Sequence, residues 1–428
     1  MFALLFCGYP IVSFLPDFIT LPDRAASIGF RALCLGLCLL LMAVGWARLK
    51  VQVWNLTLML CFWTAYSARV IYDYLYVGLP GAMDFSDFTA YIYGISLATV
   101  LAMMAVRDLR RVRYAPLICV ILCATTCILS MIYGVANFQV ELTNRLSAND
   151  RLNPITLGHT ATTLIVCALW YLLRPKGQKV SDETDELDLQ QSGFMYLVGR
   201  LSSLARVPVM LAAVIIGLYT LGLSASRAPA IALACCLVLF VIWLRGRLVY
   251  LAVLTVAVLL TFIQLGFLSQ ILDLGVNLER VSSYGMLDED LNLSGGRMDL
   301  YLEAWNKFTG SPFFGDSLFL ENMLYPHNLI LETLMATGLG GGVLLLLILG
   351  KALRNYLEQV RSSPIAFWLL LLFTQAFVGA MLSGSIFYDP MMWTTLSLGF
   401  GLAHFSRPEA ARRRPVEVGS SRSFVGVR

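Results

Sequence analysis

Long apolar segments alternate with short polar ones along most of the chain. A helix needs about 20 apolar residues to cross the hydrocarbon core of a bilayer. On that rule the pattern predicts membrane-spanning helices near residues 27–46, 55–78, 86–106, 114–135, 153–173, 204–223, 228–244, 248–267, 328–352, 364–384 and 390–405. Segment 2–19 is a further candidate, although Pro10 and Pro16 interrupt it. We therefore expect an all-α polytopic membrane protein with about 12 transmembrane helices.

The composition supports this interpretation. Hydrophobic residues make up 58% of the chain and charged residues only 14%, whereas a soluble domain is roughly a quarter charged. Lipid penalises ionised side chains, so the missing charge is the informative part. All ten cysteines lie in apolar runs, which favours neither a disulfide framework nor a zinc site.

Basic residues in the short loops predict the orientation, because cytoplasmic loops are enriched in lysine and arginine. Every second loop is basic, and the basic positions are Arg48, Lys50, Arg107, Arg110, Arg111, Arg113, Arg174, Lys176, Lys179, Arg245, Arg247, Lys351, Arg354 and Arg361. The loops between them are poor in basic residues or long. Both termini are then cytoplasmic.

Two long loops divide the chain. Segment 174–203 is predicted to be a cytoplasmic connector. Segment 268–326 is predicted to be external, and it carries nine acidic residues against Arg280, Arg297 and Lys307, a balance of −6. A loop of that length is usually functional. The expected parts are N-terminal transmembrane helices 1–173, the connector 174–203, central helices 204–267, the external loop 268–326, C-terminal helices 327–405 and a basic cytoplasmic tail 406–428.

Arg227 stands in a tight external turn, at the predicted N-terminus of a helix that runs inward. The helix dipole disfavours a cation there, unless the arginine and the free N–H groups share an anion. The alternative is an arginine that snorkels to the lipid headgroups.

Arg297 follows a Gly-Gly pair and opens a segment in which Tyr301, Ala304, Trp305 and Phe308 form one helical stripe. We predict an amphipathic helix on the membrane surface. Amides that converge beside the guanidinium again suit an anion, and the alternative is a solvated helix cap.

His327 lies where the external loop enters the next predicted span, followed by Asn328 and Glu332. Pro326 fixes that position, and imidazole suits proton transfer near neutral pH. A further external loop places Arg145 and Arg151 on the same side of the membrane, although either could be a surface charge. Arginine forks and a histidine without a metal-ligand cluster suit a diphosphate-bearing substrate.

Taken in order, these segments resemble the signature of the bacterial O-antigen ligase/polymerase superfamily. The positions that carry the resemblance are Gly296, Arg297, Ala304, Trp305, Phe308, Ser311, Pro312, Gly315, Pro326, His327, Asn328, Leu331, Glu332, Gly338 and Gly340. The Ser226–Arg227 turn resembles an upstream arginine motif of that family. Arg151, Asn153, Pro154 and Gly158 resemble its first external-loop motif, and these positions are again in the family's order. The resemblance covers the C-terminal half well and the N-terminal half mainly by span number. One departure is the short interval between Arg297 and His327.

The resemblance implies a GT-C-like glycosyltransferase of the bacterial inner membrane, with its active site facing the periplasm and short amphipathic helices in the periplasmic loop. Members take a glycan from undecaprenyl diphosphate and need no metal or cofactor. Ligases pass the glycan to lipid A–core, and polymerases pass it to another lipid-linked repeat. Arg227 and Arg297 would bind the diphosphate, and His327 would orient or deprotonate the acceptor hydroxyl.

Arg145, Arg151, Asn328 and Glu332 are the further substrate-binding candidates, and a chain-length regulator protein is a candidate partner. The segment Tyr325–Glu332 favours a polymerase, with a ligase as the alternative. A secondary transporter is the rival class, because twelve spans with a connector after the sixth are typical of transporters. Against it, the halves show no repeat and the ionisable residues gather at one face. We expect no nucleic-acid partner.

Overall fold

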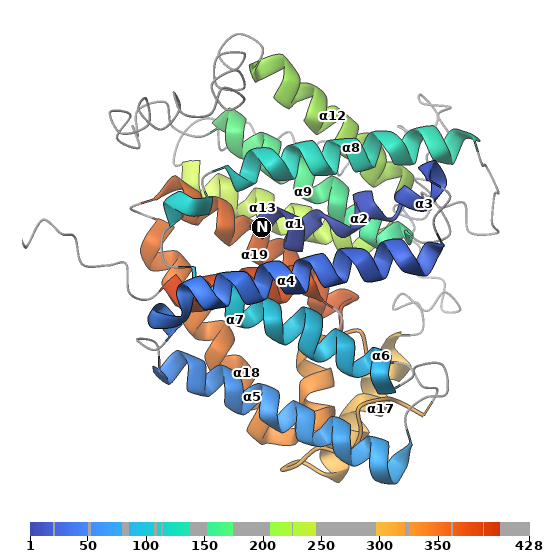
Figure 1. The fold of residues 1–428 in the computed structure, drawn as a ribbon, viewed down its shortest axis with the longest axis vertical. Coiled ribbons are helices and arrows are strands. Elements are labelled where there is room, and N and C mark those ends of the chain that lie inside the picture. The colour runs from blue at the N-terminus through green and yellow to red at the C-terminus, as the bar shows by residue number, and fades with distance from the viewer. Residues whose placement is uncertain are drawn as a thin grey trace, which may run out of the picture.

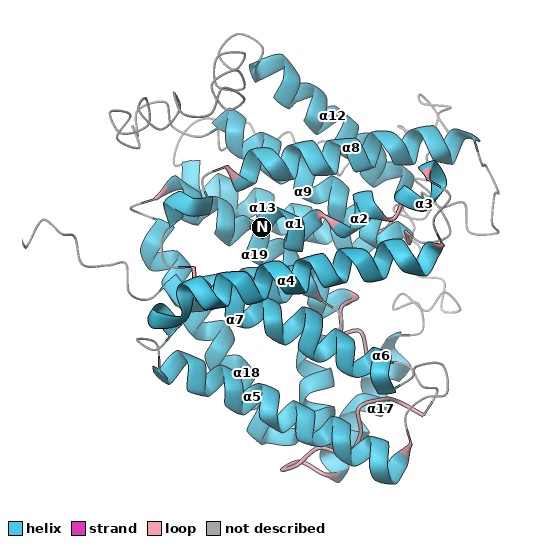
Figure 2. Cartoon of the chain, in the orientation of Figure 1, coloured by secondary structure: helices cyan, strands magenta, loops and turns pink. Residues whose placement is uncertain are grey.

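The structure is a computed structural model. It describes residues 1–19, 22–49, 53–78, 85–106, 109–112, 114–136, 152–173, 206–224, 226–244, 297–321, 325–360, 363–387 and 389–402. Within these stretches Figure 2 shows helices and loops and no strand, which agrees with the predicted all-α class.

The described helices are α1 (Phe2–Cys7), α2 (Tyr9–Val12), α3 (Leu15–Phe18), α4 (Asp23–Leu49), α5 (Val53–Tyr72), α6 (Phe85–Thr89), α7 (Ala98–Met104), α8 (Ala115–Ala136), α9 (Pro154–Leu173), α12 (Arg206–Ser224), α13 (Arg227–Leu244), α17 (Arg297–Gly310), α18 (Leu329–Val360), α19 (Pro364–Leu382) and α20 (Pro390–Gly401). Two π-helical segments continue α5 and α6, at Asp73–Val77 and Ala90–Leu97, and a short 3-10 turn spans Leu109–Val112.

Six of the described helices are long and apolar enough to cross a membrane. They lie within α4, α8, α9, α12, α18 and α19. Shorter apolar helices, Ala90–Met104 and Arg227–Trp243, lie at two more predicted spans. The predicted span 248–267 lies outside the described residues. The protein is therefore a multi-pass membrane protein, and the total of twelve spans stays a prediction.

The helices differ in how much of their apolar surface the protein itself covers. The apolar part of α9 is 72% buried, whereas that of α4 is only 17% buried. In Figure 1, α9 and α19 lie inside the bundle, whereas α4 and α12 lie at its surface. Apolar side chains that the fold leaves uncovered on α4 and α12 suit contact with lipid.

The N-terminal segment is broken where its prolines predicted. It forms three short helices, with Pro10 in the first turn of α2 and Pro16 in the first turn of α3. Proline tolerates the first turn of a helix but not its interior, because it lacks an N–H group. That residues 2–19 form a further membrane span stays a prediction.

Helix α18 is interrupted at Gly338, which has φ 62° and ψ −161°. A side chain would strain that backbone conformation, so glycine suits the position. The sequence predicted one uninterrupted span over 328–352, and the break inside it is a feature that the apolar pattern did not reveal.

Helix α17 packs against α18, and Figure 1 shows it in yellow-orange next to the orange α18. Its Ala304 is buried together with Leu320 and with Met335 of α18. Met298, Leu302 and Trp305 are exposed on a second apolar stripe. The predicted helix is therefore present, but the face that packs against the protein is set by Ala304 and Phe308 and excludes Trp305. The exposed stripe fits the predicted position at a membrane surface.

Candidate functional site

The turn that carries Arg227 is fixed to α9. Arg227 is the first residue of α13, as predicted, and the hydroxyl of buried Ser226 donates to the carbonyl oxygen of Ser224 at 3.2 Å. Pro229 packs so closely on α9 that a Cβ atom at Gly158 would lie 2.7 Å from its Cγ. Thr162 of α9 also donates to the carbonyl oxygen of Pro229, at 3.1 Å. Two contacts with α9 therefore hold in place the turn that carries Arg227.

Helix α9 in turn contacts α19 through His159 and Gln375. The side-chain amide of Gln375 donates to the carbonyl oxygen of His159 at 2.8 Å and to the hydroxyl of Thr163 at 2.9 Å. The imidazole of His159 packs on Gly379, where a Cβ atom would lie 2.8 Å from Cε1. Its buried Nδ1 has no hydrogen-bond partner among the described residues.

The His327 turn is attached to the C-terminal end of α19, close to Gly379. Asn328 donates from its side chain to the carbonyl oxygen of Met381 at 3.3 Å. Its Oδ1 accepts from the backbone N–H groups of Ile330 and Leu331, so Asn328 caps the start of α18. These contacts join the His327 turn, α19, α9 and the Arg227 turn into one continuous assembly.

His327 itself has a positive φ of 53°, the only such non-glycine residue in the described part of the chain. This left-handed conformation is uncommon outside glycine, and strained residues of this kind cluster at functional sites. Its ring packs against that of Tyr325, with 4.3 Å between the centroids. The backbone conformation sets the direction in which the side chain leaves the turn before α18, and the ring of Tyr325 packs against the imidazole.

Glu332 is buried one turn below this point and holds the loop that follows α19. Its carboxylate accepts from the hydroxyl of Ser385 at 2.6 Å and from the N–H of Ile386 at 3.1 and 3.2 Å. The next residue of that loop, Phe387, lies 6.0 Å from the ring of Tyr325. Glu332 therefore positions the loop Ser385–Phe387 beside Tyr325 and His327. These contacts occupy the carboxylate that we predicted to bind substrate.

Asp389 is a second acidic group near this loop, two residues after Phe387. It caps α20 by accepting from the N–H of Met392 at 2.9 Å. Desolvation raises the pKa of Asp389 to about 7, although the hydrogen bonds from the α20 backbone oppose that shift. Desolvation also raises the pKa of Tyr325, and the nearby carboxyls of Glu332 and Asp389 add to the shift. The neighbourhood of His327 therefore contains groups that titrate away from their ordinary range.

The segment after α17 packs directly on the break in α18, backbone against backbone. The N–H of Leu339 donates to the carbonyl oxygen of Pro312 at 2.7 Å, and that of Asp316 donates to the carbonyl oxygen of Met335 at 2.8 Å. Gly315 has φ 77°, and a Cβ atom there would lie 2.4 Å from the backbone of Ala336. Ser311–Gly315 and Gly338, which carried the family resemblance, thus form a packing contact.

Two residues of α5 and its π-helical extension hold the same segment from the other side. Arg69 and Asp73 form a buried ion pair at 2.5 Å. Arg69 donates to the carbonyl oxygens of Gly315 and Asp316, and Asp73 accepts from the N–H of Leu318 at 2.8 Å. We call this pair the α5 clamp. The signal for this pair in the sequence is weak, since it consists of two opposite charges four residues apart near a helix end.

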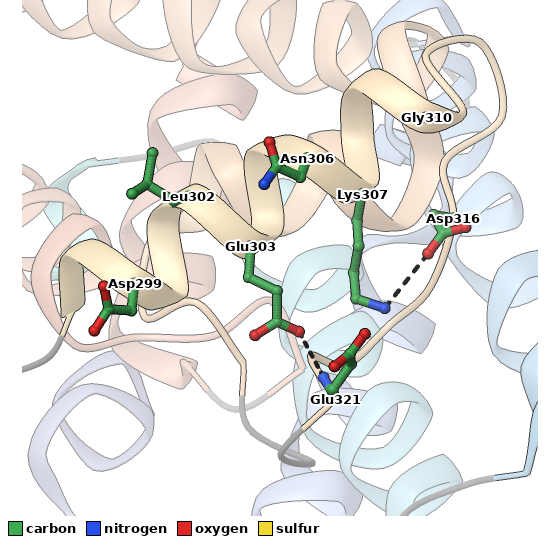
Figure 3. Close-up of a pocket in the computed structure, with 8 residues that line it drawn as sticks. All are labelled: Asp299, Leu302, Glu303, Asn306, Lys307, Gly310, Asp316 and Glu321. Carbon is green, nitrogen blue, oxygen red and sulfur yellow. Dashed lines mark hydrogen bonds and ion pairs between the residues drawn. The ribbon is translucent and has the colours of Figure 1, made fainter.

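An open groove of about 630 Å³ lies along α17 (Figure 3). Its lining residues are Asp299, Leu302, Glu303, Asn306, Lys307, Gly310, Asp316 and Glu321. Glu303 accepts from the N–H of Glu321 at 2.6 Å, and Lys307 lies 3.5 Å from the carboxylate of Asp316. Four carboxylates against one ammonium group repel an anion, so this groove does not suit a diphosphate.

The structure describes the side chains of only some of the predicted site residues. Arg227 and His327 are described and belong to one assembly. Arg297 begins α17, as predicted, but its side chain lies outside the described part, as do Arg145 and Arg151. No group of three or more His, Cys, Asp or Glu side chains among the described residues could hold a metal ion.

The comparison with protein families bears directly on this assembly. Residues 212–346 match the O-antigen ligase family. This stretch begins within α12, includes Arg227, Arg297 and His327, and ends within α18. The match confirms the resemblance to the O-antigen ligase/polymerase superfamily. The comparisons with curated proteins and with solved structures give no match.

Proposed function

We propose that this O-antigen ligase-type protein transfers a glycan from undecaprenyl diphosphate to a saccharide acceptor at the periplasmic face of the bacterial inner membrane. The observation that carries the proposal is the assembly of the Arg227 turn, α9, α19 and the His327 turn. All four of its parts are far apart in the sequence. Two of them, the turns with the arginine and the histidine, lie inside the region that matches the family.

Arg227 and Arg297 have the role of binding the diphosphate. The bond between the anomeric carbon and the diphosphate breaks as the acceptor oxygen attacks, so negative charge develops on the leaving group. Guanidinium forks stabilise that charge by bidentate hydrogen bonds. Arg227 adds its charge to the free N–H groups at the start of α13, where an anion is favoured.

His327 is the proposed base. It would accept the proton of the acceptor hydroxyl as the new glycosidic bond forms, and its fixed backbone conformation supports one direction of attack. Asn328 and Glu332 are positioning residues in this proposal. Their described contacts cap α18 and hold the loop at Ser385–Ile386. Arg145 and Arg151 stay predicted substrate contacts.

The acidic groove along α17 suits the acceptor better than the donor. The carboxylates accept hydrogen bonds from sugar hydroxyls, and the amide of Asn306 can both accept and donate them. The carboxylates repel the diphosphate. Donor and acceptor would then occupy surfaces of opposite charge.

Between the two acceptors we favour another lipid-linked repeat, which makes the protein a polymerase. Lipid A–core is the second candidate, because the matched family is described as O-antigen ligase. A strain that lacks this chain separates them. Loss of a polymerase leaves single repeats on the lipid A core, whereas loss of a ligase leaves long chains on undecaprenyl diphosphate.

The reaction is tested directly with purified protein, a synthetic undecaprenyl-diphosphate glycan and a fluorescent acceptor. We expect an elongated acceptor and free undecaprenyl diphosphate, with both products unchanged by a strong chelator. Loss of transfer that a divalent ion restores would contradict metal independence. Uptake of a solute without any transfer would favour the transporter. A chain-length regulator protein, if it is a partner, would change product length and leave the rate per bond unchanged.

A further inference from the structure

One arginine lies inside a candidate membrane span and outside the assembly described above. Arg31 belongs to α4, six residues into the apolar stretch Ala25–Gly45. At 1.5 Å per residue this places it roughly 9 Å along the helix from Ala25. It is half-buried, and its guanidinium donates a hydrogen bond to the hydroxyl of Tyr91. The guanidinium carbon also lies 4.2 Å from the centre of the Tyr91 ring.

Among the described residues, this pairing engages only part of the guanidinium. An arginine has five N–H donors, and Tyr91 is a neutral acceptor for one of them. No acidic side chain in the described part of the chain pairs with Arg31. A charge within an apolar layer costs free energy unless an anion or several acceptors compensate it, and such residues mark functional sites.

The bland alternative is an arginine that snorkels to the headgroups. A snorkelling side chain extends along its own helix toward the surface. Arg31 instead reaches across to Tyr91 of the π-helical segment Ala90–Leu97, and both the ring and the hydroxyl group of Tyr91 contact the guanidinium. The remaining N–H groups of the guanidinium form a fork, which suits phosphate oxygens.

The helix that carries Tyr91 also contacts the loop beside the His327 turn. Phe88 lies 4.8 Å from the ring of Phe387, and Ser96 donates to the carbonyl oxygen of Phe387 at 3.2 Å. Phe387 belongs to the loop that Glu332 holds, and its ring faces Tyr325. This helix therefore contacts both Arg31 and the loop Ser385–Phe387, which lies beside Tyr325.

We propose that Arg31 and Tyr91 bind the phosphate group of a lipid headgroup in the outer half of the membrane. If the chain has the proposed function, that lipid is the acceptor, a glycan on undecaprenyl diphosphate. The donor diphosphate leaves at Arg227 and Arg297, beside the reacting carbon. The acceptor reacts at the far end of its glycan, so its own diphosphate must be held at a distance from His327. A second anion site, at Arg31 and Tyr91, meets that requirement.

The first arm of the test measures binding without any transfer. The full chain is placed in nanodiscs of a zwitterionic lipid, and undecaprenyl diphosphate without a glycan is added. Native mass spectrometry counts the bound copies. We expect two copies on the wild type and one on Arg31→Gln, because losing a charged hydrogen bond weakens the second site at least about tenfold. Tyr91→Phe should weaken it less, since the ring remains. Arg354→Gln, an exposed arginine of α18, is the control and should keep two.

The second arm repeats the titration with phosphatidylglycerol. Displacement of the second copy by phosphatidylglycerol on the wild type, absent in Arg31→Gln, would assign the site to bulk phospholipid and overturn its assignment to the acceptor. Two copies on Arg31→Gln, with no change for either lipid, would overturn the anion site itself.

A transfer assay separates this proposal from the proposed function. Arg31→Gln should raise KM for a lipid-linked acceptor about tenfold and leave KM for the donor unchanged. If the wild type transfers nothing, the proposed function fails, and the two binding arms still decide whether Arg31 binds phosphate.

Discussion

The two ends of α18 both carry polar side chains inside the protein, yet they use them for different tasks. At the C-terminal end, Asn355 donates to the carbonyl oxygens of Gly399 and Phe400 at 3.0 and 3.3 Å. Tyr356 donates to the carbonyl oxygen of Thr395 at 2.6 Å. These neutral donors bind carbonyl groups of α20, and those of Gly399 and Phe400 lie in the last turn of that helix, where carbonyl groups run short of intrahelical partners.

At the N-terminal end the polar groups are acids and an imidazole. Glu332 receives three hydrogen bonds from one loop, Asp389 has a raised pKa, and His327 has a left-handed backbone conformation. The comparison teaches that buried polarity alone does not mark a site. Neutral donors that end on helix carbonyls hold helices together, whereas strained or titrating groups beside a turn are the ones to test for chemistry.

The largest expected effect separates these ends directly. His327→Ala should lower the transfer rate about a thousandfold, because the proposed base is gone while the arginines still bind donor. Asn355→Ala should keep the transfer rate per folded molecule and lose about 1 kcal/mol of stability, because it removes hydrogen bonds to α20. The rates are measured with purified protein and the fluorescent acceptor, and stability by thermal unfolding in detergent.

His327→Gln refines the role of the histidine. Glutamine can hydrogen-bond a hydroxyl but cannot take its proton, so substantial activity would mean that His327 only positions the acceptor. Full activity of the alanine variant would remove His327 from the mechanism and erase the difference between the two ends of α18.

Leaving-group binding should give the next largest effect. Arg227→Lys and Arg297→Lys keep the charge but lose the planar fork, and we expect each to lower transfer about a hundredfold at near-normal expression. Arg354→Lys is the matched control, because Arg354 is exposed and pairs only with Glu358 among the described residues. If both site variants transfer like the wild type, these arginines snorkel or cap helices and the diphosphate binds elsewhere.

The α5 clamp should matter less for transfer than either set. Arg69→Met leaves the carboxylate of Asp73 buried beside Leu318 without its cation, which costs roughly 3 kcal/mol. We expect a lower unfolding temperature and a loss of transfer of about tenfold, because α17 and the break in α18 lose their shared support. Arg69→Lys should recover part of the transfer rate.

The exposed pair Arg354–Glu358 again supplies the control. Arg354→Met should change neither quantity, since exposed ion pairs contribute little. Normal transfer with lowered stability in Arg69→Met would show that the clamp supports the fold and has no part in placing the site.

Much of this organisation was predictable, because it follows from local patterns. Apolar runs predicted the positions of the described spans. Arg227 and Arg297 stood out because each is a cation at a predicted helix N-terminus. The α5 clamp was not predictable, because Arg69 and Asp73 act on backbone groups about 245 positions away. The break at Gly338 was hidden for a similar reason. Glycines are common in membrane helices, and this one differs by its positive φ and by its close approach to the backbone of Phe313.

The smallest expected effect is a pH dependence of stability at the N-terminal end of α18. The pKa of Asp389 is raised from 3.8 to about 7, so the folded protein favours the protonated carboxyl. The stability that this group contributes is complete below its ordinary pKa and is lost as the pH rises through about 7. Glu332 and Tyr325 face the same carboxyl, and ionised Glu332 would add to the loss. Unfolding temperatures measured from about pH 5 to about pH 8 should therefore fall for the wild type. Asp389→Asn, which cannot ionise, should flatten the curve and exceed the wild type at the alkaline end. Asp299→Asn removes an exposed acid of α17 and should keep the wild-type curve. A wild-type curve that rises over this range would reverse the assigned direction and remove the distinction between Asp389 and an ordinary helix cap.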